Sequence, residues 1–123
     1  MSSFRMDRIN ESIAHHLSRL ILEEVADPRL ATMITITKVE TAKDLKTAKV
    51  YLSVLDTGKR GDVLAGLRHA ERFFIERLKE LLAIRYIPTL TFIYDDSIER
   101  MSTILGKIKA LENERKGNDS KET

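Results

Sequence analysis

The stretch Thr47-Ala-Lys-Val-Tyr-Leu-Ser-Val54 decides the fold class, because apolar and polar side chains alternate in it without exception. A period of two is the pattern of a β-strand with one face in a core and the other in water. An apolar pattern with helical spacing follows over residues 62–82, and a second alternating run over 90–94 begins after Pro88. A strand, a helix and a strand in succession predict a parallel crossover.

Upstream of this unit, the pattern predicts a helix over residues 6–25 and a strand over 33–41. The helix carries a single apolar stripe, and the Asp27-Pro28 pair ends it because proline disfavours helical backbone in the residue before it. In the strand the alternation fails at Lys38, which indicates a β-bulge or an early bend.

Downstream, a last helix is expected to begin at Asp96, with Glu99 completing a capping box. Its apolar residues continue at helical spacing as far as Ile108. Residues 112–123 contain no apolar side chain and are expected to be disordered. The sequence therefore predicts one domain over residues 1–111 and a charged tail over 112–123.

Composition excludes several classes of protein. The chain has 123 residues and no cysteine, so it is long enough for a single core and holds neither a disulfide nor a thiolate site. No apolar run approaches the ~18 residues that a membrane span needs, so we expect a cytoplasmic protein with no membrane partner. The net charge is +2, but the tail is acidic on balance, and residues 1–111 hold 18 basic against 15 acidic groups.

The predicted order is helix, strand, strand, long helix, strand, helix. It makes an α+β domain in which helices cover one face of a three-stranded sheet and the other face stays open. This is the order of the type II KH domain, an RNA-binding module. A fold alone does not establish a function.

Several motifs, in order and with similar spacing, resemble the ribosome-binding factor A family over residues 5–108. The resemblance implies a bacterial, non-enzymatic assembly factor, and we expect the protein to be a monomer. It implies binding to the small ribosomal subunit and help with late maturation of its ribosomal RNA, a need that grows in the cold. The segments that carry the resemblance are Asp27-Pro-Arg-Leu30, Ile34-Thr-Ile-Thr-Lys-Val39, Asp44-Leu45, Ala48-Lys-Val-Tyr-Leu-Ser53 and Arg85-Tyr-Ile-Pro-Thr-Leu-Thr-Phe92, followed by either Asp95 or Asp96 and by Ser97.

The long helix departs from the family pattern. The family has a kink in this helix, typically at an Ala-x-Gly triplet, and the matching residues here are Ala70-Glu71-Arg72, without the glycine. On a continuous helix Glu71 would lie inside the apolar face and Phe73 would point away from it. Either the helix bends near Ala70, or Glu71 has a partner and Phe73 is exposed.

A literal Gly-x-x-Gly occurs at 58–61, but it joins a strand to a helix, whereas the KH loop joins two helices. We interpret it as a flexible turn before Asp62, which would cap the helix. Lys59 and Arg60 remain candidates for nonspecific phosphate contacts.

Two stripes of basic side chains are the main candidates for RNA contact. On the first helix Arg8 and Arg19 share a polar stripe with Ser12 and His15. On a continuous long helix Arg68, Arg72 and Lys79 would fall within an arc of about 40°. Most such stripes are solvated helix faces, but the resemblance favours RNA contact for at least one of them. Secondary candidates are Lys43, Lys46, Lys49 and Arg85, of which Arg85 could equally brace the chain before the last strand.

The sequence gives little support for a catalytic function. His15 and His16 are neighbours on a helix and point in different directions, so they do not chelate one metal together. No Gly-x-Ser-x-Gly, Walker or dinucleotide pattern appears. We therefore predict no catalytic residue, no metal and no cofactor. The alternative class is a protein-interaction module that docks through the open sheet face or the long helix.

Overall fold

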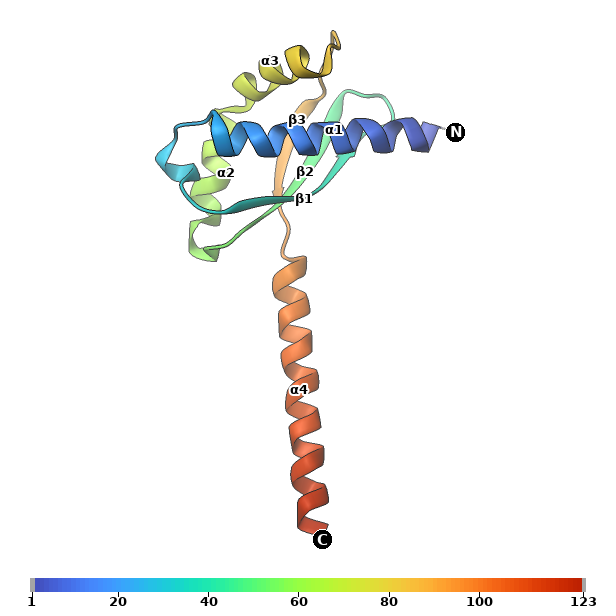
Figure 1. The fold of residues 1–123 in the computed structure, drawn as a ribbon, viewed down its shortest axis with the longest axis vertical. Coiled ribbons are helices and arrows are strands. Elements are labelled where there is room, and N and C mark those ends of the chain that lie inside the picture. Colours follow the sequence, from blue (N-terminus) through green and yellow to red (C-terminus); the bar gives the residue numbers. More distant parts are fainter. Residues whose placement is uncertain (1, 123) are drawn as a thin grey trace.

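The protein folds into a sheet with helices on one face, and its last helix leaves this body (Figure 1). The structure is a computed structural model that describes the backbone of residues 2–122 and the side chains of residues 5–116. Its element order is the α+β, type II KH-like order that the sequence predicts. The elements are α1 (Ser2–Glu23), η1 (Pro28–Leu30), β1 (Ile34–Thr41), β2 (Thr47–Val54), η2 (Thr57–Lys59), α2 (Arg60–His69), α3 (Glu71–Leu82), β3 (Thr89–Tyr94) and α4 (Ser97–Glu122).

Helix α1 lies across the sheet because one of its faces is apolar (Figure 1). Ile13, Leu17 and Leu20 follow one another on this face, and at most 3% of each residue is exposed. The helix spans Ser2–Glu23 rather than the predicted 6–25. Such shifts at helix ends are expected, because terminal turns are held by few backbone hydrogen bonds.

Strand β2 is central, with antiparallel β1 on one side and parallel β3 on the other. The register places Val50 opposite both Val39 and Phe92, so the buried residues of the three strands share one face. The register of β1 shifts between Ile36 and Lys38, which confirms the predicted bulge.

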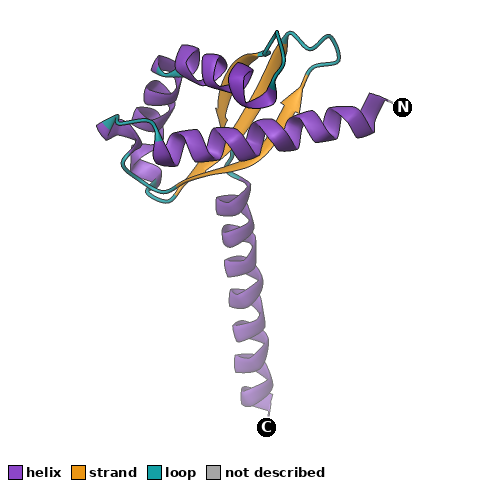
Figure 2. Cartoon of the chain, turned by 45° about the horizontal axis from the view of Figure 1, so that its top comes forward, coloured by secondary structure: helices purple, strands orange, loops and turns teal. Residues whose placement is uncertain are grey.

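The core lies between this face of the sheet and helices α1, α2 and α3 (Figure 2). Phe74 of α3 is fully buried, and its ring meets that of Phe92 edge-on with the centroids 6.1 Å apart. On the opposite, open face Lys49 and Thr91 are exposed neighbours in the register. The buried apolar residues are Ile13, Leu17, Leu20, Leu30, Val39, Ala48, Val50, Leu52, Val54, Val63, Leu67, Phe74, Leu78, Leu90 and Phe92.

The predicted long helix is interrupted at Ala70. α2 ends at His69 and α3 begins at Glu71, in the place where the disturbed apolar pattern predicts a bend. Ala70 has φ −88° and ψ 1°, a bridge-region conformation that L-residues adopt without a glycine. The glycine of the family pattern is therefore not needed for this break.

The two explanations offered for the disturbed pattern both hold. Besides the break at Ala70, the Glu71 carboxylate has a partner, because its Oε1 accepts a hydrogen bond from the Leu90 backbone N–H at 3.0 Å. Phe73 is 40% exposed. The break thus turns α3 so that Glu71 caps an N–H of β3 while Phe74 enters the core.

Helix α4 projects away from the body and does not join the other helices on the sheet (Figure 2). Its apolar residues recur at the helical spacing of a packed helix, but they are exposed to solvent. The exposed fraction is 48% for Ile108 and 59% for Ile98. The predicted tail at 112–123 lies partly outside the described residues. As far as Glu122 the backbone continues as helix, in keeping with the helix-forming Glu, Arg and Lys side chains of this segment.

The start of α4 differs from the predicted capping box. Asp95, rather than Asp96, accepts a hydrogen bond from the Ser97 backbone N–H, at 2.9 Å. Glu99 accepts a hydrogen bond from the Tyr94 hydroxyl instead of reaching back to the cap residue. The first turn is therefore anchored to the end of β3.

Asp95 also connects this turn to the bulge of β1. The Thr37 hydroxyl donates to Asp95 Oδ2 at 2.6 Å. These hydrogen bonds favour the charged carboxylate, the one from Thr37 most strongly, and lower the pKa of Asp95 from 3.8 to about 2.

We expect this contact to stabilise the fold at neutral pH and to fail in acid. Because the folded-state pKa lies below the unfolded value, the contribution is complete above about pH 4 and is lost as the pH falls through about 2. Asp95→Asn should therefore lower the urea midpoint at pH 7 and lower it much less at the acid end. Asp96→Asn, which removes an exposed ion pair with Arg100, is the control. An equal, pH-independent effect of Asp95→Asn would contradict this account.

Candidate nucleic-acid interface

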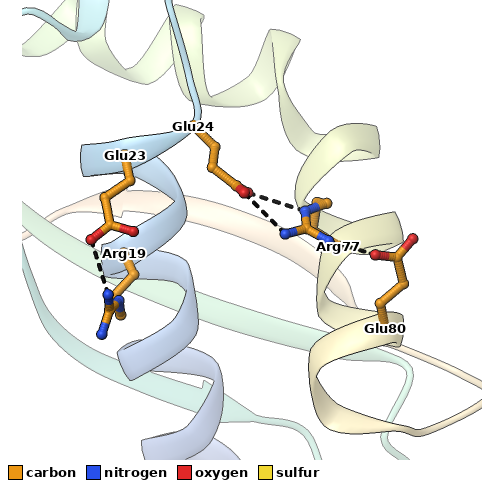
Figure 3. Close-up of polar contacts among 5 residues, drawn as sticks. All are labelled: Arg19, Glu23, Glu24, Arg77 and Glu80. Atoms are coloured by element: carbon orange, nitrogen blue, oxygen red, sulfur yellow. Dashed lines mark hydrogen bonds and ion pairs between the residues drawn. The ribbon is translucent and has the colours of Figure 1, made fainter.

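The predicted basic stripe on α1 contains one paired and one unpaired arginine. Arg19 forms an ion pair with Glu23 at 3.1 Å, one turn further along the helix (Figure 3). Arg8 is exposed, and the ion pairs found among the described side chains do not include it. Arg8 is therefore the arginine of this stripe that is available to a phosphate.

The predicted stripe on the long helix does not exist as a single helix face. The arc that grouped Arg68, Arg72 and Lys79 assumed a continuous helix, and the break at Ala70 leaves Arg68 on α2 and the other two on α3. Lys79 lies 3.6 Å from Glu76 in an exposed ion pair. Arg68 and Arg72 are exposed, but on separate helices.

Arg77, which was not among the residues predicted from the sequence, connects the end of α1 to α3. Its guanidinium bonds both Glu24, directly after α1, and Glu80 on its own helix (Figure 3). The contact lowers the pKa of Glu24 and raises that of Arg77, in each case mainly through their shared hydrogen bonds. Arg77 therefore holds the end of α1 against α3 rather than standing free for a ligand.

The open sheet face carries charges of both signs. Lys49 lies opposite Glu40 in the register of β1 and β2. Glu40 already pairs with Lys38 at 3.0 Å, and the Lys38 ammonium lies 4.7 Å from the centroid of the Tyr51 ring. This face is a mixed surface rather than a cationic one.

The Gly-x-x-Gly segment folds as a turn that leads into α2. The Asp56 carboxylate accepts a hydrogen bond from the Gly58 N–H at 3.1 Å, and α2 begins at Arg60. The helix thus starts before Asp62, which lies in its first turn and is not the cap residue as predicted. Arg60 lies over the Tyr94 ring, 5.4 Å from the centroid, and Lys59 is exposed.

The remaining candidates gather at the other end of the sheet. Arg5, Lys46 and Arg85 line one cavity of about 600 Å³, which lies between the start of α1, the β1–β2 turn and the segment from α3 to β3. Arg8 lines a second cavity of about 200 Å³ that shares Arg5 with the first. Lys43 is exposed in the same β1–β2 turn. This end of the molecule brings together cations from three separate parts of the chain.

Sequence reasoning missed two members of this group, Arg5 and Tyr86. Tyr86 is 78% exposed, and the Arg85 guanidinium lies over its ring with 5.6 Å between Cζ and the centroid. Arg5 lies one helical turn before Arg8, so the same stripe contained the signal. For Tyr86 the signal was an aromatic residue directly after an arginine, between the predicted long helix and the last strand.

The charges of this group lack acidic partners. Among the described side chains Arg5, Arg8, Lys46 and Arg85 take part in no ion pair. The cavity contains one carboxylate, Asp44, which accepts a hydrogen bond from the Lys46 backbone N–H at 3.0 Å. We call these four basic residues the basic end. Its excess positive charge suits a polyanion.

The residues that the structure describes carry neither a metal-binding cluster nor a membrane-spanning helix. That part of the chain shows no cluster of three or more histidine, aspartate or glutamate side chains arranged to hold a metal ion. None of its helices combines the length and the apolarity that crossing a bilayer requires.

Comparison with known proteins gives a consistent result. The sequence pattern of the family named ribosome-binding factor A matches residues 5–108. The ribosome-binding factor A of Agathobacter rectalis is 44% identical over 99 residues, which is 80% of this chain and 82% of that protein. The crystal structure of ribosome-binding factor A from Thermus thermophilus superposes with a TM-score of 0.66 at 25% identity, covering 72% of this chain and 93% of that one.

A second set of coordinates concerns the same relative. It is a homology model of the Thermus thermophilus ribosome-binding factor A as fitted into the cryo-EM map of a 30S–RbfA complex, with a TM-score of 0.51, 26% identity and coverage of 69% of this chain and 93% of that one. The family match extends over most of the chain, and the fold agrees with the solved structures. This chain therefore belongs to the ribosome-binding factor A family.

Proposed function

We propose that this protein binds the small ribosomal subunit through its ribosomal RNA and assists late maturation of that RNA. The observation that carries the proposal is the family match over residues 5–108, together with a relative that has been fitted into the cryo-EM map of a 30S–RbfA complex. The protein acts in the cytoplasm as a monomer, uses no cofactor and catalyses no reaction. Its part is to hold RNA in a conformation that favours maturation.

The basic end is the surface that we assign to the RNA. Its four cations are free of acidic partners, whereas Arg19 and Lys79 are each in an ion pair. A free cation gains more from a phosphate, because no existing pair has to be broken. Lys43, Lys49, Lys59, Arg60, Arg68 and Arg72 remain further candidates outside this group.

The proposal predicts binding to 30S subunits that weakens steeply with salt. Each phosphate contact contributes roughly −0.7 to −0.9 to the slope of log affinity against log salt, so four contacts give a slope of about −3 to −4. Co-sedimentation with 30S subunits over a series of KCl concentrations measures it. Replacing Arg5, Arg8, Lys46 and Arg85 by Gln should weaken binding and make the slope much flatter.

A matched control removes the same charge from paired cations by replacing Arg19, Lys38, Lys79 and Arg100 with Gln. This variant should keep most of the slope. A flat salt response of the parent protein would favour the other class, a protein-interaction module that docks through the open sheet or the α2–α3 region. Equal losses in both variants would mean that overall charge, not the basic end, drives binding.

A further inference from the structure

We propose that the cavity at the basic end takes one unstacked nucleotide of single-stranded RNA, with its base against Tyr86 and its phosphate between Arg5, Lys46 and Arg85. The proposal rests on the proposed function and names the chemical form of the RNA that this end recognises. The volume of the cavity, about 600 Å³, lies within the range of ~300–1,000 Å³ that is typical of small-ligand sites.

One wall of the cavity is apolar and open to solvent. Tyr86, Leu45 and Ile84 line it, and they are 78%, 50% and 40% exposed. A large apolar surface that faces water beside charged groups marks a binding site more often than a structural one. A flat aromatic ring is the surface on which an unpaired base stacks.

Left-handed backbone conformations occur at one of these side chains and directly before another. Leu45 has φ 62° in the β1–β2 turn, and Ala83, directly before Ile84, has φ 52°. They are the non-glycine residues with positive φ in the described part of the chain. Leu45 lines this cavity, and Ala83 is the left-handed C-cap of α3, directly before the lining residue Ile84. Such conformations persist where the surrounding structure imposes them, and they gather at ligand sites.

The turn itself shows what imposes the conformation of Leu45. The Leu45 N–H donates to the Ala42 carbonyl oxygen at 2.9 Å, and the Lys46 N–H donates to the Asp44 carboxylate at 3.0 Å. These two bonds present Leu45 and Lys46 side by side at the cavity. An apolar contact for a base and a cation for its phosphate are thus held on consecutive residues.

The charge of the lining selects among possible occupants. Three unpaired cations face one carboxylate, which is engaged by a backbone N–H, so an anion is favoured over a neutral apolar segment. Arg85 lies over the Tyr86 ring, so a cation and an aromatic face already share one wall. A base in a duplex has its faces covered by its neighbours, whereas an unstacked nucleotide offers a bare face together with a phosphate.

Binding of a short fluorescent single-stranded oligouridylate to the full chain, measured by anisotropy, tests the proposal. Tyr86→Ala should weaken binding about 5- to 150-fold, which corresponds to the ~1–3 kcal/mol of one base–aromatic stack, without changing the salt slope. Tyr86→Phe should bind like the parent, and Arg85→Gln should flatten the slope by about one contact. Because Tyr86 is exposed, thermal unfolding should show both tyrosine variants folded.

Two further probes separate base recognition from charge alone. An abasic oligonucleotide should bind the parent as weakly as the oligouridylate binds Tyr86→Ala, and a duplex should compete poorly. Normal oligouridylate binding by Tyr86→Ala, or equal competition by an acidic peptide, would overturn the cavity proposal. If the cavity proposal fails but 30S binding by the parent protein is still salt-dependent, the proposed function stands. If 30S binding also shows no salt dependence, the cavity proposal and the proposed function are both overturned.

Discussion

Phe74→Ala is expected to lower the free energy of unfolding by about 3–5 kcal/mol, the usual cost of emptying a buried aromatic site. Phe74 is fully buried in α3 and its ring packs edge-on against Phe92 of β3. The loss would be a large part of the ~5–15 kcal/mol that holds a typical domain folded. Urea unfolding monitored by circular dichroism measures it.

The neighbouring phenylalanine provides a matched control. Phe73 is 40% exposed and contacts the Phe74 ring with the centroids 5.9 Å apart. Phe73→Ala should therefore cost only about 1 kcal/mol. Similar losses of unfolding free energy in the two variants would contradict the orientation of α3 that follows the break at Ala70, in which Phe74 faces the core and Phe73 is partly exposed.

The alternation of apolar and polar residues in β2, together with the apolar patterns before and after it, was enough to predict the three-stranded sheet, the bulge in β1 and the packing of helices on one face of the sheet. Period-two and helical patterns report burial directly, because each apolar residue that faces the core must recur on the same face. The break at Ala70 was also visible, since Glu71 and Phe73 did not fit one continuous apolar face. The direction of α4 was not predictable, because its apolar spacing is that of a packed helix and yet its residues are exposed.

The candidate interface was predictable only in part. Lys46 and Arg85 could be named as cations, but a sequence does not show which cations have acidic partners. Arg19 and Lys79 are paired by residues a turn away, while Arg8 is not. The cavity itself depends on three segments far apart in the chain, so only the fold shows that Arg5 and Tyr86 belong to the same site as Lys46 and Arg85.

The break at Ala70 places Glu71 where its carboxylate can accept a hydrogen bond from the backbone of β3. Its Oε1 accepts a hydrogen bond from the Leu90 N–H at 3.0 Å, and Leu90 is only 4% exposed. This N–H lies in β3, on the edge of the sheet, and water would replace the carboxylate poorly at a buried residue. A glutamate inside an apolar pattern is thus explained by one backbone donor that needs an acceptor.

Glu71→Ala should cost about 1–3 kcal/mol of unfolding free energy, because it leaves the Leu90 N–H without its acceptor. Glu71→Gln keeps a side-chain oxygen of the same reach and should restore most of the loss, apart from the part that the negative charge contributes. Amide hydrogen exchange at Leu90 adds a local readout, and protection there should fall in the alanine variant and largely return in the glutamine one. If alanine and glutamine were equally harmless, the contact would be incidental. Glu71 would then be an ordinary surface residue at the start of α3, and the break at Ala70 would have to be held by core packing alone.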